Sequence, residues 1–386
     1  MKLERLDSVT TIIMGQAPPG ESYNTDSDGW PLIAGAGDFN QGSPAPKKYT
    51  TEPSKLSRSG DILLGIRASI GDKVLADKEY CIGRGVASLR PNDCIDIRYL
   101  WNWLGFSSNE LAAKGKGATF KQVNSQDIAE MMIPVPPIAQ QRRIAEVLDH
   151  VDALREKRRK SIALLDDLAQ SIFLDMFGDS HGRHRGWPVR PAGEFLDFLT
   201  SGSRGWARYY SDTSDSLFIR IQNVRKDELV LDDIAYVDPP KSAEAERTRV
   251  QPGDVLLSIT ADLGRTAVVP SNIGPAYINQ HLAILRTRQV EPQYLSSYIA
   301  SPSGQTQLLR RNRQGVKAGL NFNDIRSLLI PIPPTSYQKK YVETLAECRD
   351  TRARLAESLT HLDTLFSSIQ SRAFRGELWQ DDLKDL

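Results

Sequence analysis

The chain has 386 residues, of which 40% are hydrophobic and 25% are charged. This length allows two ordinary domains, and no stretch approaches the roughly 20 uninterrupted apolar residues that a membrane span needs. The formal net charge of +1 argues against a protein that coats nucleic acid nonspecifically, because such binding depends on neutralising many phosphates. Any contact with nucleic acid must therefore be local or shared with partners.

The N-terminus and the cysteines both indicate the cytoplasm. The first seven residues, MKLERLD, contain two acids and no apolar segment, unlike a secretory signal peptide. Cys81, Cys94 and Cys348 are odd in number and far apart, which favours reduced, buried thiols over a disulfide framework. We therefore expect a cytoplasmic protein.

The most informative feature of the sequence is an internal duplication. The segment GDILL at residues 60–64 returns as GDVLL at residues 253–257, about half a chain later. Residues 61–66 and 254–259 are short apolar runs bounded by polar and turn-forming residues, the pattern of buried strands. Each half of the chain is therefore predicted to form a mixed α and β domain.

The turns after these strands agree in their scaffold and differ in their polar residues. Residues 71–74 correspond to residues 264–267, and residues 80–85 correspond to residues 277–281 with one residue of slippage. Glycines and hydrophobic residues match in the two copies, whereas the polar side chains do not. The differing side chains are candidate readers of a ligand, and we assign this role to Lys73, Arg84, Arg265 and Gln280.

An acid-free basic stretch follows in each copy, at residues 111–126 and 308–323. Gly-rich basic loops let the backbone approach phosphates, and Arg, Asn and Gln can also bond base edges. The alternative is a solvated loop without function, which the recurrence at matching positions makes less attractive. The candidate DNA contacts here are Lys114, Lys116, Lys121, Arg310, Arg311, Arg313 and Lys317, and Arg67 and Arg204 complete the set.

A proline cluster and a long helix end each copy. The cluster reads IPVPP at residues 133–137 and IPIPP at residues 330–334, in both cases shortly after Asn-x-x-Asp-Ile. Residues 138–177 and 337–374 then contain no Gly or Pro and are rich in helix formers. About 40 residues make a helix of roughly 60 Å, which is too long for the core of one compact domain.

The two predicted helices carry matching apolar seams. The first seam comprises Ile144, Val151, Leu165 and Ile172, which match Tyr341, Cys348, Leu362 and Ile369, and Val147, Leu154 and Leu168 fill the second seam of the first helix. Antiparallel pairing of the helices would carry the two globular domains to opposite ends of one spacer. The alternative is that each helix packs on its own domain. Arg158 and Ser161, both at seam positions, weaken the apolar stripe of the first helix near its middle.

Motifs for catalysis and metal binding are incomplete. The segment Asp238-Pro239-Pro240-Lys241 has lysine where amino-methyltransferases have an aromatic residue that stacks on a flipped base. The sequence has no credible glycine fingerprint for S-adenosylmethionine and no phosphate-binding loop. His181 and His184 lack further ligands nearby, which favours a solvated linker over a metal site. We therefore expect no catalytic residue, metal site or cofactor in this chain.

With its duplicated Ile-Pro-Val/Ile-Pro-Pro cluster, followed by Gln and a long helix, the sequence resembles the specificity subunits of type I restriction-modification systems. The closing segment AFRGEL at residues 373–378 is the most specific part of the resemblance, which covers essentially the whole chain. Where the family usually has Glu-Gln after the first proline cluster, this chain has Ala139-Gln140-Gln141, and the second copy has Ser336-Tyr337-Gln338.

The resemblance implies an α+β fold with two mixed α/β target recognition domains, separated by two long antiparallel coiled-coil helices in a pseudo-two-fold arrangement. The implied division is residues 1–135, 136–178, 179–333 and 334–386, in the order domain, helix, domain, helix and tail. The expected partners are double-stranded DNA, two modification subunits that methylate adenine, and restriction subunits, with S-adenosylmethionine and ATP on those partners. The residues expected to dock the partner subunits are Gln140, Gln141, Gln338, Phe177 and Phe374.

Two other classes of function remain open at this point. One is a coiled-coil adaptor whose globular ends bind proteins, and the other is an enzyme with an unrecognised site. The sequence favours a DNA-reading subunit that is not an enzyme by itself and that recognises an asymmetric, two-part DNA site, because the two copies share a scaffold but differ in their polar loops.

Overall fold

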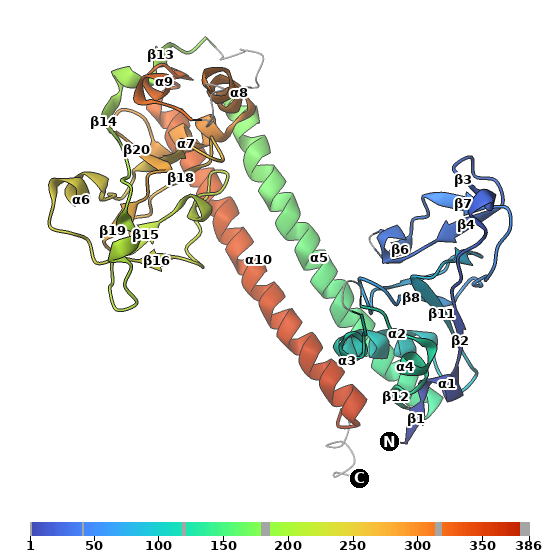
Figure 1. The fold of residues 1–386 in the computed structure, drawn as a ribbon. Helices are drawn as coiled ribbons and strands as arrows, with labels where there is room; N and C mark the ends of the chain where they lie inside the picture. The colour runs from blue at the N-terminus through green and yellow to red at the C-terminus, as the bar shows by residue number, and fades with distance from the viewer. Residues whose placement is uncertain (1, 41, 118–120, 179–185, 313–318, 379–386) are drawn as a thin grey trace. The chain divides into compact units, whose positions relative to one another are not determined.

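The computed structural model describes residues 2–40, 42–117, 121–178, 186–312 and 319–378. By its internal contacts the chain divides into unit 1, residues 1–159 and 357–386, and unit 2, residues 160–356. Each unit contains one globular domain together with parts of both long helices (Figure 1). This division differs from the predicted one, in which the helices were separate modules.

The domain of unit 1 is built on a four-stranded antiparallel sheet in the order β2-β11-β8-β9. These strands are β2 (Thr10–Met14), β11 (Val86–Pro91), β8 (Ile62–Gly65) and β9 (Lys73–Leu75). A second sheet has the order β10-β4-β7-β3, with β10 (Cys81–Ile82), β4 (Trp30–Ile33), β7 (Lys48–Thr50) and β3 (Tyr23–Asn24). The remaining elements used below are β1 (Leu3–Arg5), which pairs with β12 (Met132–Pro134), and helices α2 (Ile97–Phe106), α3 (Ser108–Ala113) and α4 (Ser125–Ala129).

Unit 2 repeats the main elements of this plan. Its four-stranded sheet has the order β14-β20-β17-β18, formed by β14 (Leu196–Ser201), β20 (Leu282–Thr287), β17 (Val255–Ser258) and β18 (Thr266–Val268). A smaller sheet contains β16 (Ala235–Tyr236), β15 (Leu217–Ile219) and β19 (Ala276–Ile278). The counterparts of the other elements are β13 (Val189–Pro191) paired with β21 (Leu329–Pro331), α7 (Pro292–Ala300), α8 (Pro302–Arg311) and α9 (Phe322–Arg326). The predicted duplication and both predicted strands are confirmed.

A buried ion pair occupies the same place in both four-stranded sheets. In unit 1, Arg90 on β11 donates to both oxygens of Asp61 at 2.8 and 2.7 Å. In unit 2, Arg286 on β20 does the same to Asp254 at 2.6 and 2.8 Å. Burial by itself would raise the pKa of Asp61, but hydrogen bonds from Arg90, from the Ser88 hydroxyl and from the backbone outweigh burial and lower it. The aspartate of the repeated Gly-Asp sequence therefore stabilises the sheet in each unit.

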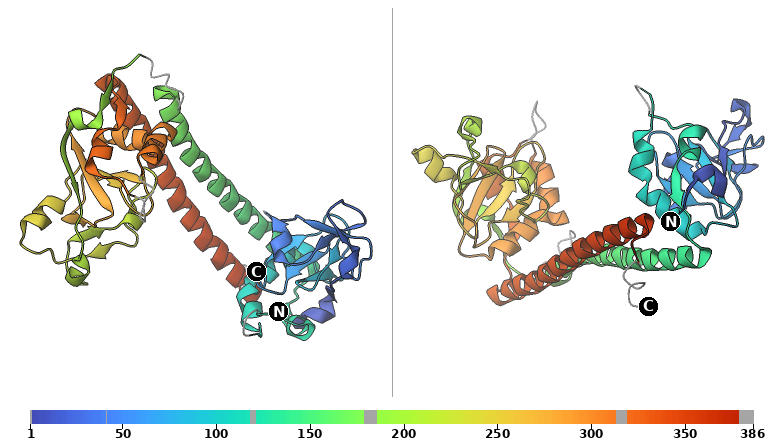
Figure 2. Two further views of the ribbon diagram at one scale, coloured as in Figure 1. Left: turned by 45° about the horizontal axis from the view of Figure 1, so that its top comes forward. Right: turned by 90° about the horizontal axis from the view of Figure 1, so that it is seen from below.

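Both predicted long helices are present and uninterrupted, as α5 (Ile138–Phe177) and α10 (Thr335–Arg375) (Figures 1 and 2). The core of unit 1 contains Ile144 and Leu148 from the start of α5 and Phe374 from the end of α10. The core of unit 2 correspondingly contains Tyr341 and Leu345 from the start of α10 and Phe177 from the end of α5. Each domain core therefore buries one end of each helix, so both helices belong to both units. Among the described helices, none combines the length and apolar character of a membrane span.

Within each unit the two helices are joined by an ion pair that the duplication repeats. In unit 1 the Nε of Arg155 lies 2.7 Å from an oxygen of Asp363, and in unit 2 the Nε of Arg352 lies 2.6 Å from an oxygen of Asp166. Arg155 and Arg352 occupy equivalent positions in the two helices, as do Asp166 and Asp363. In unit 1 the start of α5 packs with the end of α10, and in unit 2 the end of α5 packs with the start of α10, so the pairing within each unit is antiparallel, as predicted.

The seam between the helices is less apolar than the sequence suggested. Ile144, Val151 and Tyr341 of the first seam are buried, but Leu154 and Leu168 of the second seam are 37% and 46% exposed. Leu154 and Leu168 are therefore only partly covered at the predicted second seam. Heptad spacing only places residues on one helix face, and here ion pairs rather than leucines join that part of the helices.

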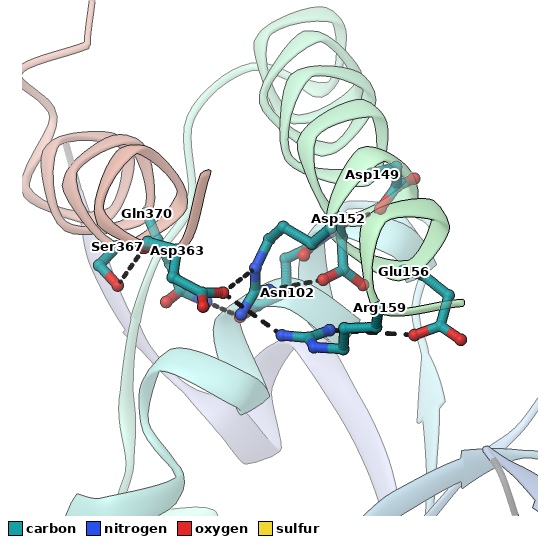
Figure 3. A network of polar contacts seen from close by, with 9 residues as sticks. Asn102, Asp149, Asp152, Glu156, Arg159, Asp363, Ser367 and Gln370 are labelled. Carbon is teal, nitrogen blue, oxygen red and sulfur yellow. Dashed lines mark hydrogen bonds and ion pairs between the residues drawn. The ribbon is translucent and has the colours of Figure 1, made fainter. Parts of the chain in front are cut away.

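Figure 3 shows how the domain of unit 1 is tied to the helices. Asn102 on α2 donates from its Nδ2 atom to Asp149 on α5 at 3.0 Å, and its carbonyl oxygen accepts from the Nε2 of Gln370 on α10 at 3.2 Å. Close by, Asp363 accepts from Arg159 at 3.3 Å. One helix of the domain is thus bonded to both long helices at once.

Unit 2 has a polar network in the corresponding region, but with other residues. The carboxylate of Asp227 accepts from the hydroxyls of Ser296 and Ser297 at 2.5 and 2.6 Å and from the Gln293 amide at 2.9 Å. Arg349 of α10 donates to the Asp227 carbonyl oxygen at 2.8 Å. Burial raises the pKa of Asp227 in spite of these donors. The two domains are therefore anchored on the same helices by different polar groups.

Candidate nucleic-acid interface

Three separate segments of unit 1 meet at one end of its four-stranded sheet. The backbone N–H of Ile66, just after β8, donates to the Gly85 carbonyl oxygen at 3.0 Å, and the N–H of Val123 donates to the Ile66 carbonyl oxygen at 3.1 Å. Beside this junction Arg67 pairs with Gln122, and Gln122 pairs in turn with Lys116. We call the resulting surface the first loop surface and define it by Arg67, Arg84, Lys116 and Lys121.

The first loop surface is basic and accessible. Arg84, Lys116 and Lys121 are exposed, and Arg67 is half-buried. The Nε atom of Arg67 is buried and has no hydrogen-bond partner within the described residues, which do not include residues 118–120 of the adjoining loop. Four predicted DNA-contacting residues therefore lie together, although they are up to 54 positions apart in the sequence.

Unit 2 has a surface at the same place, with different chemistry. The N–H of Ile259 donates to the His281 carbonyl oxygen at 2.9 Å, and the N–H of Leu320 donates to the Ile259 carbonyl oxygen at 2.9 Å. These bonds reproduce the junction at Ile66. We call this surface the second loop surface and define it by Thr260, Gln280, His281 and Arg204. Arg204 lies there because its neighbour Ser203 pairs with Asn279.

A left-handed backbone turn supports each surface. Ala68, directly after Arg67, has φ 55°, and Ala261, directly after Thr260, has φ 64°. A non-glycine residue rarely adopts this conformation, which costs on the order of 1–3 kcal/mol and is frequent at functional sites. Both domains therefore keep the same strained turn, and the residue before it is Arg67 in one and Thr260 in the other.

Three of the predicted DNA contacts interact with other groups of the protein. The Nζ of Lys73 lies 4.5 Å from the centre of the Trp101 ring, and burial lowers the pKa of Lys73 to about 8, with Asp152 and Asp72 opposing the shift. Arg265 donates to Asp262 at 2.7 Å, and Arg311 donates to the hydroxyl and carbonyl oxygens of Ser327, both at 2.8 Å. The contacts of Arg265 and Arg311 lie at the surface, so a DNA contact by these residues, as by Lys73, stays a prediction.

The other predicted contacts fall into two groups. Lys114 ends α3 and lies 3.6 Å from Glu110, so a carboxylate partly neutralises it, whereas Arg310 is exposed at the end of α8. Arg313 and Lys317 lie outside the described residues, as do His181 and His184 of the predicted linker. A DNA contact therefore remains a prediction for four residues: Lys114, Arg310, Arg313 and Lys317.

The residues expected to dock partner subunits are mostly buried. The Oε1 of Gln141 accepts from the Asp96 N–H at 2.8 Å, and its Nε2 donates to the Cys94 and Pro136 carbonyl oxygens at 3.0 and 2.8 Å. Gln338 makes equivalent bonds to Glu291 and Pro333. Direct docking through either side chain is not supported, since each one is enclosed by its own domain.

Phe374 and Phe177 are also internal. Their rings lie 5.4 Å from Tyr99 and 4.7 Å from Tyr294, centre to centre, and both phenylalanines belong to the domain cores. The recurring helix end therefore completes a core rather than offering a docking contact. Gln140 alone of the five candidates is partly exposed, and its docking role remains a prediction.

Replacing Gln141 by alanine should destabilise unit 1 by about 1–3 kcal/mol, because a buried N–H and two buried carbonyl oxygens lose their partner. Thermal unfolding of the purified chain measures this loss. Gln140→Ala removes the same side chain one position earlier, where it is partly exposed, and should leave the unfolding temperature unchanged. If Gln141→Ala kept full stability but no longer bound methyltransferase subunits, the docking role would stand after all.

Sequence reasoning missed Thr260 and His281, although it identified their neighbour Gln280. Thr260 Oγ1 lies 2.6 Å from His281 Nδ1, and the Nε2 of Gln280 lies 3.0 Å from His281 Nε2. The signal was present in the repeat, because His281 stands where the first copy has Gly85 and Thr260 stands where it has Arg67. The three side chains form one hydrogen-bonded chain on the second loop surface.

Comparison with known proteins gives a consistent result. A family model for the type I restriction modification DNA specificity domain matches residues 1–164 and 220–359. The chain is 37% identical over 162 residues to a putative type I restriction enzyme MjaX specificity subunit of Methanocaldococcus jannaschii, which covers 42% of this chain and 38% of that protein. It is 21% identical to the type I restriction enzyme EcoBI specificity subunit of Escherichia coli, over 99% of this chain and 87% of that one.

The fold is also similar to that of a solved structure. A chain from a structural study of complex assembly and conformational transition in a type I R-M system matches with a TM-score of 0.63 at 22% identity, over 98% of both chains. At this identity the likeness concerns the fold alone. It extends over both units and both long helices.

Proposed function

Because the chain belongs to the family of type I restriction modification DNA specificity proteins, we propose that it is the specificity subunit of such a system and directs it to an asymmetric, bipartite DNA site. The observation that carries this proposal is the pair of loop surfaces, which share a junction and a strained turn but present different side chains. Each unit then reads one half of the site, and the halves differ in sequence. Nothing observed favours the alternative of a protein-binding adaptor.

The first loop surface supplies both charge and hydrogen-bond donors. Lys116 and Lys121 can neutralise phosphates, and the guanidinium groups of Arg67 and Arg84 can donate two bonds to one guanine edge. Among its defining residues, all of them within the described part of the chain, the second loop surface has one cation, Arg204, beside the neutral polar groups of Thr260 and Gln280. This contrast supports different base preferences in the two half-sites.

The chemistry of the complex is assigned to partner subunits. The chain would assemble with two adenine-methylating modification subunits, which bind S-adenosylmethionine, and with restriction subunits, which bind ATP. Its own contribution is to hold the complex on the correct DNA sequence. Two modest half-site contacts within one chain reinforce each other, because binding of the first raises the effective concentration of the second.

The direct test is to express the chain with the methyltransferase subunits encoded beside it and to sequence the methylated genomic DNA. We expect one bipartite motif with two different halves and a fixed gap. Omitting this chain should abolish methylation at that motif. Methylation that persists without the chain, or a motif that does not depend on which specificity chain is present, would contradict the proposal.

Lys116→Ala and Lys121→Ala should each weaken binding of the complex to all DNA sequences by a similar factor. Each loss of a phosphate contact should also lower the slope of log affinity against log salt by about 1. A salt titration of DNA binding measures both effects. Lys78→Ala is the matched control, because Lys78 is exposed in the loop that contacts the start of β8, at the opposite end from Arg67. Equal slopes for all three variants would show that this loop does not face DNA.

A further inference from the structure

We propose that Thr260, His281 and Gln280 form a base-reading unit of the second domain, in which Gln280 contacts an A·T pair and the other two residues position it. This inference rests on the proposed function and adds a specific reader and its supports. No sequence motif indicates this base-reading unit. It follows from the hydrogen bonds among the three side chains and from their place on the second loop surface.

The two hydrogen bonds of the histidine ring fit a single tautomer. The nitrogen of a glutamine amide can only donate, so the Nε2 of Gln280, 3.0 Å from His281 Nε2, requires that ring atom to accept. The other ring nitrogen, Nδ1, then carries the proton of the neutral imidazole and donates to Thr260 Oγ1 at 2.6 Å. In this tautomer both ring nitrogens have a hydrogen-bond partner.

The same bonds determine the orientation of the Gln280 amide. One of its N–H groups is held by His281, which leaves the second N–H and the carbonyl oxygen unused by this pair. One donor beside one acceptor matches the N7 and N6 atoms of adenine, the pairing that glutamine makes in the major groove. A glutamine that is free to rotate would pay a conformational cost on binding, and this one has been ordered in advance.

The backbone around the three residues is also held in place. His281 N–H donates to the Asn279 side-chain oxygen at 3.2 Å, and Ala261 adopts the left-handed turn that follows Thr260. At Gly202, on the neighbouring segment, a side chain would meet the carbonyl oxygen of Asn279, so the segment carrying Arg204 lies directly against this loop. A cation for the phosphate backbone therefore lies beside the proposed base contact.

The domain of unit 1 has different residues at the positions of this base-reading unit. Arg67, Arg84 and Gly85 stand where unit 2 has Thr260, Gln280 and His281. Glycine offers no side chain to orient its neighbour, and a guanidinium group prefers the two acceptors of guanine. The two half-sites are therefore expected to differ at the equivalent position, with a G·C pair facing unit 1 and an A·T pair facing unit 2.

The test uses the complete complex and methylation sequencing of genomic DNA. Gln280→Ala should reduce the preference for A·T at one position of one half-site by about 10- to 100-fold and leave the other half-site unchanged. Gln280→Glu replaces the donor by an acceptor and should shift that position towards cytosine. Gln289→Ala removes the same type of side chain at the opposite, exposed end of β20 and should change nothing.

The positioning role has its own matched pair of variants. Thr260→Val removes the hydroxyl that holds His281 and should weaken the same A·T preference, whereas Thr260→Ser keeps the hydroxyl and should restore it. Unfolding temperatures and affinity for nonspecific DNA should be the same for both variants, which separates positioning from loss of structure. If the wild-type complex shows a bipartite motif but the Gln280 variants leave it intact, the reader assignment fails while the proposed function stands. If the wild-type complex shows no motif that depends on this chain, the proposed function itself fails.

Discussion

Removing one heptad from both long helices, residues 157–163 of α5 and residues 354–360 of α10, is expected to shorten the gap between the two recognised half-sites by about three base pairs. Seven helical residues correspond to about 10 Å, and one base pair to about 3.4 Å. Each helix continues from one unit into the other, so its length is part of the connection between them. The half-site sequences should not change, because no residue of either loop surface is altered.

The paired deletion is designed to keep the helices in register. Both deleted segments lie between the residues of the repeated ion pairs Arg155–Asp363 and Arg352–Asp166, so both pairs can still form. Seven residues are close to two full turns, which also keeps the same faces in contact. Deleting the heptad from α5 alone is the control, and it should lower the unfolding temperature because one ion pair is then out of register. A paired deletion that methylates the original motif would refute the dependence on helix length.

Arg90→Met is expected to cost about 3–5 kcal/mol of unfolding free energy at neutral pH. It leaves Asp61, which is 2% exposed, as a buried carboxylate without its cation. Urea unfolding monitored by circular dichroism measures the loss. Arg5→Met is the control, because Arg5 pairs with Asp7 on the surface at 2.8 Å, and we expect no measurable change for it.

The pH dependence of this variant should separate charge from packing. In the wild type the pKa of Asp61 is lowered, so the ion pair stabilises the fold above the ordinary carboxyl pKa of about 4, and that stability is lost as the pH falls through the lower folded value. In Arg90→Met, burial dominates and raises the pKa of Asp61, so stability is lost as the pH rises through the raised value. The difference between variant and wild type should therefore shrink towards pH 4. A difference that is constant with pH would mean that Arg90 acts through packing alone.

The strands and long helices could be predicted because their patterns are local. The apolar runs at residues 61–66 and 254–259 match β8 and β17, and the Gly-free segments match α5 and α10 to within a few residues. The repeat strengthened each prediction, since two copies of one pattern are independent evidence for one structure. The loop surfaces were partly predictable for the same reason, because Arg84 and Gln280 occupy matching positions with different side chains.

The use of individual polar residues was not predictable in this way. Lys73 and Arg311 read as exposed cations in the sequence, yet Lys73 packs on Trp101 and Arg311 bonds Ser327. Gln141 and Gln338 read as docking residues, yet both are hydrogen-bonded inside their domains. Each of these residues has at least one partner 16 or more positions away, which no local pattern reports.

The sequence by itself determined that this protein is a duplicated chain of two α+β domains and two long helices, because hydrophobic periodicity, turn residues and repetition are properties of the chain alone. Only the tertiary structure decided which polar groups remain available for DNA. Burial and hydrogen bonding depend on neighbours that are distant in sequence, as His281 shows by bonding both its neighbour Gln280 and Thr260, which lies 21 positions from His281. The repeat identified where the two domains differ, and the fold determined which of those differences face outwards.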